Sequence, residues 1–187
     1  AFGLNPSPCY AKPVTVSENL IISIGDGVAE VVINRPDKAN ALDRPTWDAL
    51  GQAFIQLDED RSVRAILIRG EGRGFCGGID FSMIMEIVAK ASNLEEGEKQ
   101  EFVLRTIRGL QQAFTAIEAC RKPVIAAVHG ACYGAGIDLI TACDIRLGSK
   151  DAQLCVKEVD LGIVADVGTL QRLPPIIGQG LSREMAF

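Results

Sequence analysis

The alternation of apolar and polar residues along the chain predicts short strands separated by amphipathic helices. A hairpin is expected over residues 20–33, because the apolar runs LIISI and VAEVVI flank a turn at Asp26 and Gly27. Further short strands are expected at VRAILIRG (63–70), VIAAV (124–128), IRLGS (145–149) and AQLCVKEV (152–159). These runs are too short for helices and are bounded by glycine, proline or polar residues.

Other segments carry their apolar residues at helical spacing. Trp47, Phe54 and Leu57 recur in this way after Asp43, and Pro45 suits the first turn of a helix. Further helical segments are expected over residues 83–101, 107–117 and 137–144, with a solvated acidic patch at the end of the first and Pro123 as the break after the second. The alternation of strands and helices predicts an α/β fold with a largely parallel sheet.

The length and composition fit a single domain. The chain has 187 residues, of which 48% are hydrophobic, so a sizeable core can form. Residues 1–19 contain Pro, Ser and Asn and are expected to form an arm before a core over residues 20–187. The final LSREMAF is typical of the middle of a helix and has no capping signal. We therefore expect the C-terminal helical part of the domain to be missing from this chain.

Charge and cysteine usage exclude several classes of function. The formal net charge is −5 without a basic cluster, so no nucleic-acid partner is expected. The apolar runs are too short to span a bilayer, and the first residues lack the apolar core of a signal peptide. The six cysteines form no CxxC pair and the chain has one histidine, so no metal site is expected. Free thiols in a reducing compartment are the simpler interpretation.

Two glycine-rich segments follow predicted strands, EGRGFCGGIDF (71–81) and the expected turn HGACYGAGID (129–138). Glycine at a strand end permits positive φ and a close approach of the backbone to a ligand. Two such segments side by side could aim two backbone N–H groups at one oxygen, as in an oxyanion hole. From glycine alone, two tight turns are the simpler interpretation. Neither segment is GxxxxGK[ST], and the likeness of GACYGAG to a dinucleotide-binding motif lacks an early βαβ unit.

The segment VKEVDLGIVADVG (156–168) places acidic residues among apolar ones. A carboxylate in apolar surroundings costs free energy unless it is paired, hydrogen-bonded or protonated. Glu158 and Asp166 are therefore candidates for acid–base chemistry, and the alternative is a surface ion pair with Lys157 or Arg172. Asp138 ends the second glycine-rich segment, where its alternative role is to complement the dipole of the helix that begins there.

Three blocks, in this order, carry a resemblance: FCGGIDF, KPVIAAVHGACYGAGIDLITACDIRL and VKEVDLGIVADVGTLQRLPPIIG. Together they resemble the enoyl-CoA hydratase/isomerase (crotonase) superfamily over nearly the whole chain, and NRPDKANAL (34–42) resembles the loop after its early strands. The resemblance implies a crotonase-like β-β-α spiral fold, assembled as a homotrimer or a hexamer. It also implies acyl-CoA thioester substrates, with no cofactor besides the coenzyme A of the substrate.

The resemblance further implies which residues form the site. The backbone N–H groups of Ile79 and Ala135 correspond to the oxyanion hole, although the family more often has glycine at the second position. Hydratases of the family have two glutamates where this chain has Asp138 and Glu158, and tend to have a small residue in place of Asp166. The implied catalytic residues are Asp138, Glu158 and Asp166, and the implied substrate-binding residues are Gly77, Gly78, Ile79, Asp80, Phe81 and Ala135.

Through its third carboxylate, Asp166, the chain resembles the branch of Δ3,5-Δ2,4-dienoyl-CoA isomerases. This resemblance implies an isomerase of fatty-acid β-oxidation. In it, Asp166 takes the proton beside the thioester and Glu158 supplies the distal proton, with Asp138 in support. Two alternatives stay open, an enoyl-CoA hydratase that forms 3-hydroxyacyl-CoA and a non-catalytic acyl-CoA-binding homologue. The resemblance implies the mitochondrial matrix or the peroxisome, without choosing between them.

Overall fold

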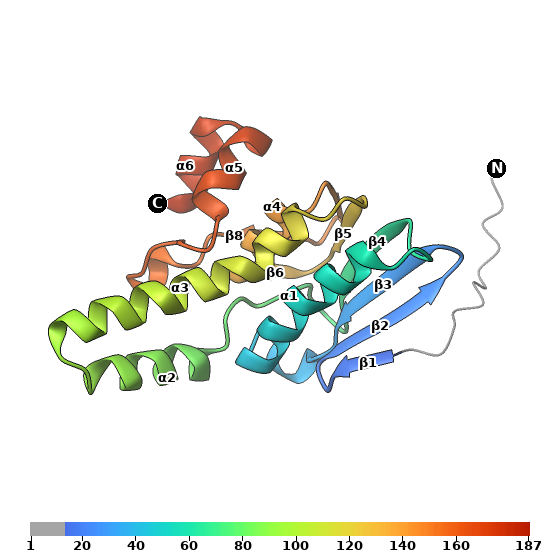
Figure 1. The fold of residues 1–187 in the computed structure, drawn as a ribbon. Helices are drawn as coiled ribbons and strands as arrows, with labels where there is room; N and C mark the ends of the chain where they lie inside the picture. Colours follow the sequence, from blue (N-terminus) through green and yellow to red (C-terminus); the bar gives the residue numbers. More distant parts are fainter. Residues whose placement is uncertain (1–13) are drawn as a thin grey trace.

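The computed structural model describes residues 14–187, which form a mixed β-sheet with helices packed against it (Figure 1). The sheet has six strands in the order β1-β2-β3-β4-β5-β7. Pairing is antiparallel from β1 to β3 and parallel from β3 to β7. The strands are β1 (Val14–Ser17), β2 (Leu20–Gly25), β3 (Val28–Ile33), β4 (Ala65–Gly70), β5 (Val124–Val128) and β7 (Ile145–Gly148). The predicted α/β fold with a largely parallel sheet is confirmed.

The hairpin of β2 and β3 is confirmed, and its turn explains its sequence. Asp26 and Gly27 both have positive φ, 52° and 82°. A two-residue turn of this kind needs positive φ at both positions, and Asp followed by Gly adopts it readily. The last part of the arm expected over residues 1–19 contains a strand, because Val14–Ser17 forms β1 and pairs with β2. Residues 1–13 of that arm lie outside the described residues.

The helices lie against the sheet and beyond its end (Figure 1). α1 packs against α3, and α2 and α3 form a hairpin that extends away from the sheet. α1 begins where predicted, since the carboxylate of Asp43 accepts a hydrogen bond from Thr46 N–H and Pro45 lies in the first turn. The helices are α1 (Arg44–Glu59), α2 (Phe81–Ser92), α3 (Glu96–Glu118), α4 (Ala135–Ala142), α5 (Thr169–Ile177) and α6 (Gln179–Ala186), with 3-10 turns η1 (Pro36–Lys38) and η2 (Val159–Leu161).

Two helix boundaries differ from the prediction. The segment expected to be helical over residues 83–101 is broken after Ser92, and α3 begins at Glu96. The acidic patch thus forms the first turn of α3, where Glu96 and Glu98 complement the helix dipole. α3 ends at Glu118, before Pro123, so the proline is not what terminates it.

A second, two-stranded sheet forms from β6 (Ala131–Tyr133) and β8 (Gln153–Cys155), which pair in parallel. β6 lies inside the segment HGACYGAG, where the sequence predicts only a turn. A three-residue strand is too short to give a periodic pattern, which explains the error. The isolated bridge between Cys76 and Cys132 then brings the first glycine-rich segment alongside β6.

The core lies between the sheet and the helices that cover it. The rings of Trp47 and Phe114 have centroids 5.0 Å apart and are tilted by 58°, a favourable arrangement for aromatic pairs. The indole N–H of Trp47 donates to Leu110 O at 3.0 Å, so this polar atom is satisfied inside the core. The pair joins α1 to α3. Over residues 14–187, no helix is both long enough and apolar enough to cross a membrane.

Candidate active site

The two glycine-rich segments lie side by side. Phe75 N–H donates to Ala131 O and Tyr133 N–H donates to Cys76 O, each at 2.9 Å. A Cβ placed on Gly78 would lie 3.7 Å from Ala135 N, in van der Waals contact. A Cβ on Gly130 would lie 2.1 Å from Arg73 O, so only glycine permits this approach. The structure therefore brings together the two segments that the sequence singles out.

Ile79 and Ala135, whose N–H groups are predicted to form the oxyanion hole, line one cavity at this junction. Leu42 N–H donates to Gly78 O and Asp80 N–H donates to Leu42 O, at 2.8 and 2.9 Å. The N–H of Ile79, between them, has no backbone acceptor within the described part of the chain. Ala135 is the first residue of α4, and the first N–H groups of a helix have no acceptor inside it. Both residues line the same cavity, as an oxyanion hole requires.

The cavity has a volume of about 100 Å³ and lies between the glycine-rich segments and residues 157–167. All of the predicted catalytic carboxyls line it, and so do four of the predicted substrate-binding residues. Apolar residues between positions 161 and 167 complete the wall of the cavity. Its lining consists of Trp47, Gly77, Gly78, Ile79, Leu110, Gly134, Ala135, Asp138, Lys157, Glu158, Leu161, Ile163, Val164, Asp166 and Val167.

Asp80 and Phe81, also predicted to bind substrate, do not line this cavity. The carboxylate of Asp80 caps α2 by accepting from Ser82 N–H at 2.9 Å, and it forms an ion pair with Arg35. The hydroxyl of Ser82, and then Arg35, lower the pKa of Asp80 to about 2. Phe81 is 64% exposed. The structure thus gives Asp80 a role in holding the first glycine-rich segment to α2.

Asp138 is wholly buried and is held by Thr169. Its Oδ1 accepts from both the N–H and the hydroxyl of Thr169, each at 2.7 Å. Its Oδ2 is buried without a hydrogen-bond partner among residues 14–187. Burial raises the pKa of Asp138 to about 6, the bonds from Thr169 oppose this rise, and the charge of Glu158 adds to it. Complementing a helix dipole, the alternative role, would not require this burial.

Glu158 and Asp166 are partly buried in the same wall. Glu158 Oε2 is buried without a partner in the described region, and Oε1 would lie 3.4 Å from a Cβ at Gly134. Burial raises the pKa of Glu158, and the charge of Asp166 adds to the rise. Burial also raises the pKa of Asp166. Gln111 Nε2 donates to Asp166 O at 2.6 Å and fixes this loop to α3.

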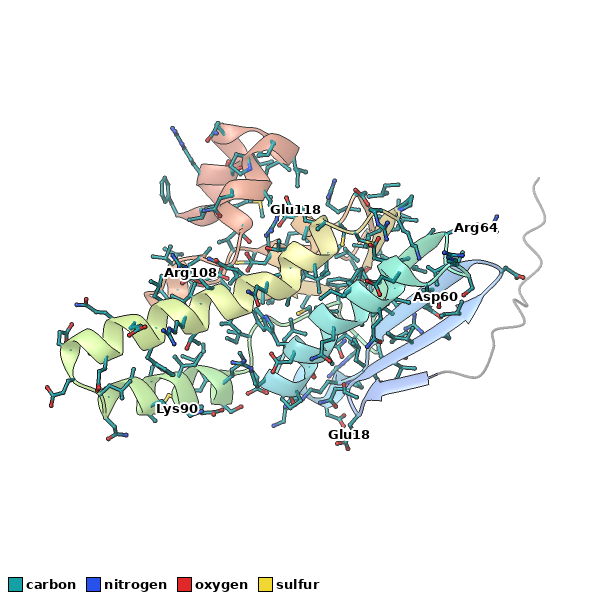
Figure 2. All side chains as sticks on the ribbon, in the orientation of Figure 1. Glu18, Asp60, Arg64, Lys90, Arg108 and Glu118 are labelled. Carbon is teal, nitrogen blue, oxygen red and sulfur yellow. The ribbon has the colours of Figure 1, made fainter. Side chains whose placement is uncertain are left out.

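The alternative of surface ion pairs is not what the structure shows for these two carboxyls. Lys157 pairs with Asp160 instead. Arg172 pairs with Glu118, which Figure 2 labels on α3, at 2.7 Å. Its guanidinium also donates to Val167 O.

A wider groove of about 570 Å³ among α3, α4 and α5 shares Asp166 and Val167 with the cavity. Neither Glu158 nor the glycine-rich segments line it. Arg146, in its wall, already donates to Ile140 O and Asp144 O at the end of α4. The smaller cavity is therefore the candidate active site.

Sequence reasoning missed two residues that hold this site, Thr169 and Gln111. Each acts on a partner far away in the chain, so neither leaves a local pattern. Trp47 and Leu110 were predicted only as helix residues, and they also line the cavity. In the part of the chain that the structure describes, no group of three or more His, Cys, Asp or Glu residues is placed to hold a metal ion.

Comparisons with known proteins agree on the family. Residues 23–187 match the family model of enoyl-CoA hydratase/isomerase. The peroxisomal Delta(3,5)-Delta(2,4)-dienoyl-CoA isomerase of Arabidopsis thaliana is 49% identical over 86% of this chain and 58% of its own length. The mitochondrial Delta(3,5)-Delta(2,4)-dienoyl-CoA isomerase of Homo sapiens is 44% identical over 86% of this chain and 49% of its own length. The chain thus spans about half the length of these relatives.

The fold is also that of solved members. The crystal structure of an enoyl-CoA hydratase/carnithine racemase from Magnetospirillum magneticum has a TM-score of 0.78 and 29% sequence identity to this chain. The match covers 90% of this chain and 60% of that one, and it confirms the predicted crotonase-like fold. Family model, relatives and structure lead to one conclusion: this chain belongs to the enoyl-CoA hydratase/isomerase family.

Proposed function

We propose that the cavity is the active site of an isomerase that converts a 3,5-dienoyl-CoA into a 2,4-dienoyl-CoA in fatty-acid β-oxidation. The observation that supports this most is Asp166, a third carboxyl with a raised pKa in the wall that holds Glu158 and Asp138. The two relatives named above are dienoyl-CoA isomerases by name. A hydratase needs two carboxyls to hold a water, and the third would then have no role.

The proposed first step is removal of a proton from C2 of the acyl chain. The electron pair moves toward the thioester, so negative charge develops on its oxygen. The N–H groups of Ile79 and Ala135 donate hydrogen bonds to that oxygen and stabilise the charge. Such preorganised donors act more strongly where apolar residues line the site, and Leu161, Ile163 and Val164 line this cavity.

The proposed second step returns a proton at C6. The double bonds at C3 and C5 then lie at C2 and C4, and one proton has been lost and one gained. Because C2 and C6 are four bonds apart, two carboxyl groups serve better than one. In the order that the family pattern implies, Asp166 removes the C2 proton and Glu158, protonated at the start, supplies the C6 proton. Burial raises the pKa of both groups, which is the direction that favours proton exchange by a carboxyl.

Ultraviolet absorbance tests this function. A 3,5-dienoyl-CoA gains conjugation with the thioester when it becomes the 2,4-isomer, so absorbance of the conjugated dienoyl thioester should grow. A 2-enoyl-CoA should keep its absorbance. Growth on the first substrate supports the isomerase, and no change with either substrate would instead support a non-catalytic acyl-CoA-binding protein.

The second candidate is an enoyl-CoA hydratase. The buried oxygens Asp138 Oδ2 and Glu158 Oε2 both have no partner among the described residues, and a water held between two carboxyls would satisfy them. Loss of absorbance from 2-enoyl-CoA, without growth from 3,5-dienoyl-CoA, would establish this activity. The chemistry of either reaction needs no cofactor besides the coenzyme A of the substrate.

We further propose assembly as a homotrimer or a hexamer, in the mitochondrial matrix or the peroxisome. Exposed apolar residues on β7 and β8, Ile145, Leu147 and Leu154, supply surface that association would cover. The relatives with this activity are named as peroxisomal and mitochondrial proteins, which supports the two compartments.

A further inference from the structure

Thr169 makes two hydrogen bonds to one oxygen of a fully buried carboxyl. Its backbone N–H and its hydroxyl both donate to Asp138 Oδ1 at 2.7 Å, and Thr169 itself is 1% exposed. The other oxygen, Oδ2, is buried and has no partner among the residues that the structure describes. Asp138 lines the same cavity as Glu158 and Asp166. The two oxygens of this carboxyl are therefore in different surroundings.

We propose that Thr169 is a positioning residue of the site, which engages Oδ1 of Asp138 so that the proton of this carboxyl resides on Oδ2, the oxygen left for the cavity. The inference rests on the proposed isomerase function and adds a residue that acts through Asp138 without touching the substrate. It also gives Asp138 a defined part. With a proton on Oδ2, Asp138 is a hydrogen-bond donor in the cavity that holds Glu158.

The two hydrogen-bond donors of Thr169 determine which oxygen of Asp138 carries the proton. A hydroxyl can rotate and accept a hydrogen bond, but a backbone N–H can only donate. A proton on Oδ1 would face the N–H of Thr169, so protonation at Oδ1 is disfavoured. Oδ2 meets no donor of the described chain, and a proton placed there costs no existing bond. A buried polar atom without a partner is costly, and a ligand in the cavity removes that cost.

The position of Thr169 in the chain extends its effect to Asp166. Thr169 is the first residue of α5 and follows Asp166 by three residues, so its bonds tie this loop to α4. Gln111 holds the same loop from α3 through Asp166 O. The contact thus sets the place of Asp138 and of the loop that carries a proposed acid–base group.

The charged and titratable groups around Asp138 come from several elements. Glu158 precedes η2 and Arg172 belongs to α5, and the charge of each acts on the pKa of Asp138. Cys76 lies in the first glycine-rich segment, and the charge of Asp138 helps to raise the pKa of its thiol. Asp166 and Lys157 line the same cavity. Replacing the side chain of Thr169 changes none of these five residues and keeps the backbone N–H bond that ties the loop to α4. A change in the titration of Asp138 therefore reports the lost hydroxyl bond.

The test compares Thr169→Val, Thr169→Ser and Thr141→Val in the intact protein. Valine keeps the shape and the backbone N–H, which still disfavours a proton on Oδ1, and it removes the hydroxyl bond that helps to hold the carboxyl in place. Serine restores the hydroxyl. Thr141 is the matched control, because its buried hydroxyl bonds the backbone oxygens of Ile137 and Asp138 and not the carboxyl. Two kinds of measurement are made: the kinetics of the isomerase, as kcat and KM, and the pH midpoint of the infrared C=O band that is absent in Asp138→Asn.

A bond to the carboxylate favours its charged form, so its removal raises the pKa. In Thr169→Val the infrared midpoint should move up by about one to two pH units, as expected for one hydrogen bond to a charged group. The kcat should fall about 10–100-fold, which corresponds to the free energy of one hydrogen bond to a charged group, and KM should be nearly unchanged. Thr169→Ser should restore both quantities, and Thr141→Val should change neither.

Three results would overturn the inference: a wild-type midpoint and kcat in Thr169→Val, the same losses in Thr141→Val, or no recovery in Thr169→Ser. The infrared midpoint needs no substrate, so it separates this inference from the proposed activity. A protein without isomerase activity whose midpoint still moves in Thr169→Val would refute the proposed function and support the positioning role.

Discussion

Glu158 differs from the acidic residues around it in its surroundings. Asp160 is exposed and paired with Lys157, whereas Glu158 has one oxygen buried without a partner among the described residues. If Glu158 supplies the distal proton, Glu158→Gln should lower isomerase turnover by about 10²–10⁴, the usual contribution of a general acid or base. Asp160→Asn in the same loop is the control and should be active. Equal turnover in the two variants, measured by absorbance, would remove Glu158 from the mechanism.

The order of the two proton transfers is tested with deuterium. In heavy water, Glu158→Gln lacks the distal donor, but Asp166 can still remove and return the C2 proton. Deuterium should therefore enter C2 of recovered 3,5-dienoyl-CoA in Glu158→Gln and not in Asp166→Asn, as read by mass spectrometry. The opposite pattern would reverse the order. That alternative has a structural basis, because Glu158 Oε1 lies near Gly134, next to the donor Ala135.

The buried carboxyl of Asp138 also makes stability depend on pH. Its pKa rises from 3.8 to about 6 on folding, so the folded state binds more protons between these values. This contribution to the free energy of unfolding is present below about pH 4 and is lost as pH rises through 6. The loss is about 3 kcal/mol, from about 1.4 kcal/mol per pKa unit. Asp138→Asn lacks it, so urea unfolding of the variant should depend less on pH in this window. A constant difference between the two proteins at all pH values would contradict this.

At the residue scale, the sequence alone points to the acids but not to their supports. Asp166 and Glu158 stand out because a carboxylate among apolar residues is costly. Thr169 bonds a residue 31 positions earlier, and Gln111 bonds one 55 positions later. No local pattern encodes such contacts. The ion-pair partners of Lys157 and Arg172 could not be predicted from the sequence either, because several acidic residues lie near each cation along the chain.

Among the elements, α2 carries a capping residue that ties it to the first glycine-rich segment. Asp80 caps the helix directly after Ile79 and pairs with Arg35. Asp80→Ala should cost about 1–2 kcal/mol at neutral pH, as lost N-caps do. Because the pKa of Asp80 is lowered to about 2, the wild-type advantage should be lost as pH falls from about 4 toward 2.

Asp80→Asn separates the two parts of this effect, since asparagine caps helices but carries no charge. Urea unfolding should show that it keeps most of the neutral-pH stability and loses the acid-dependent part. Equal stability of Asp80→Ala and wild type at pH 7 would show that the cap contributes nothing.

At the element scale, long periodic segments were predictable and short ones were not. The hairpin, α1 and the parallel strands followed from spacing and turn residues. β6 did not, because three residues inside a glycine-rich turn carry no period. The sequence does not predict the break between α2 and α3, because only three residues, 93–95, separate the two helices.

At the scale of the whole molecule, apolar residues on β7, β8 and α5 are exposed, including Leu147, Leu154 and Leu170. Association would bury them, so light scattering on the intact protein should give the mass of a trimer or a hexamer. Leu147→Glu and Leu154→Glu together should shift that mass toward monomer if this surface is the interface. A single monomeric mass for the wild type would refute the assembly.

The assignment of an isomerase depends most on Asp166, and one comparison tests it directly. The rate of 2,4-dienoyl-CoA formation from 3,5-dienoyl-CoA is measured for wild type and Asp166→Asn, with thermal unfolding as the check on the fold. The isomerase account predicts that the variant is folded and slower by about 10²–10⁴, which is roughly 3–5 kcal/mol of barrier. Near-normal turnover in a folded Asp166→Asn protein would contradict it.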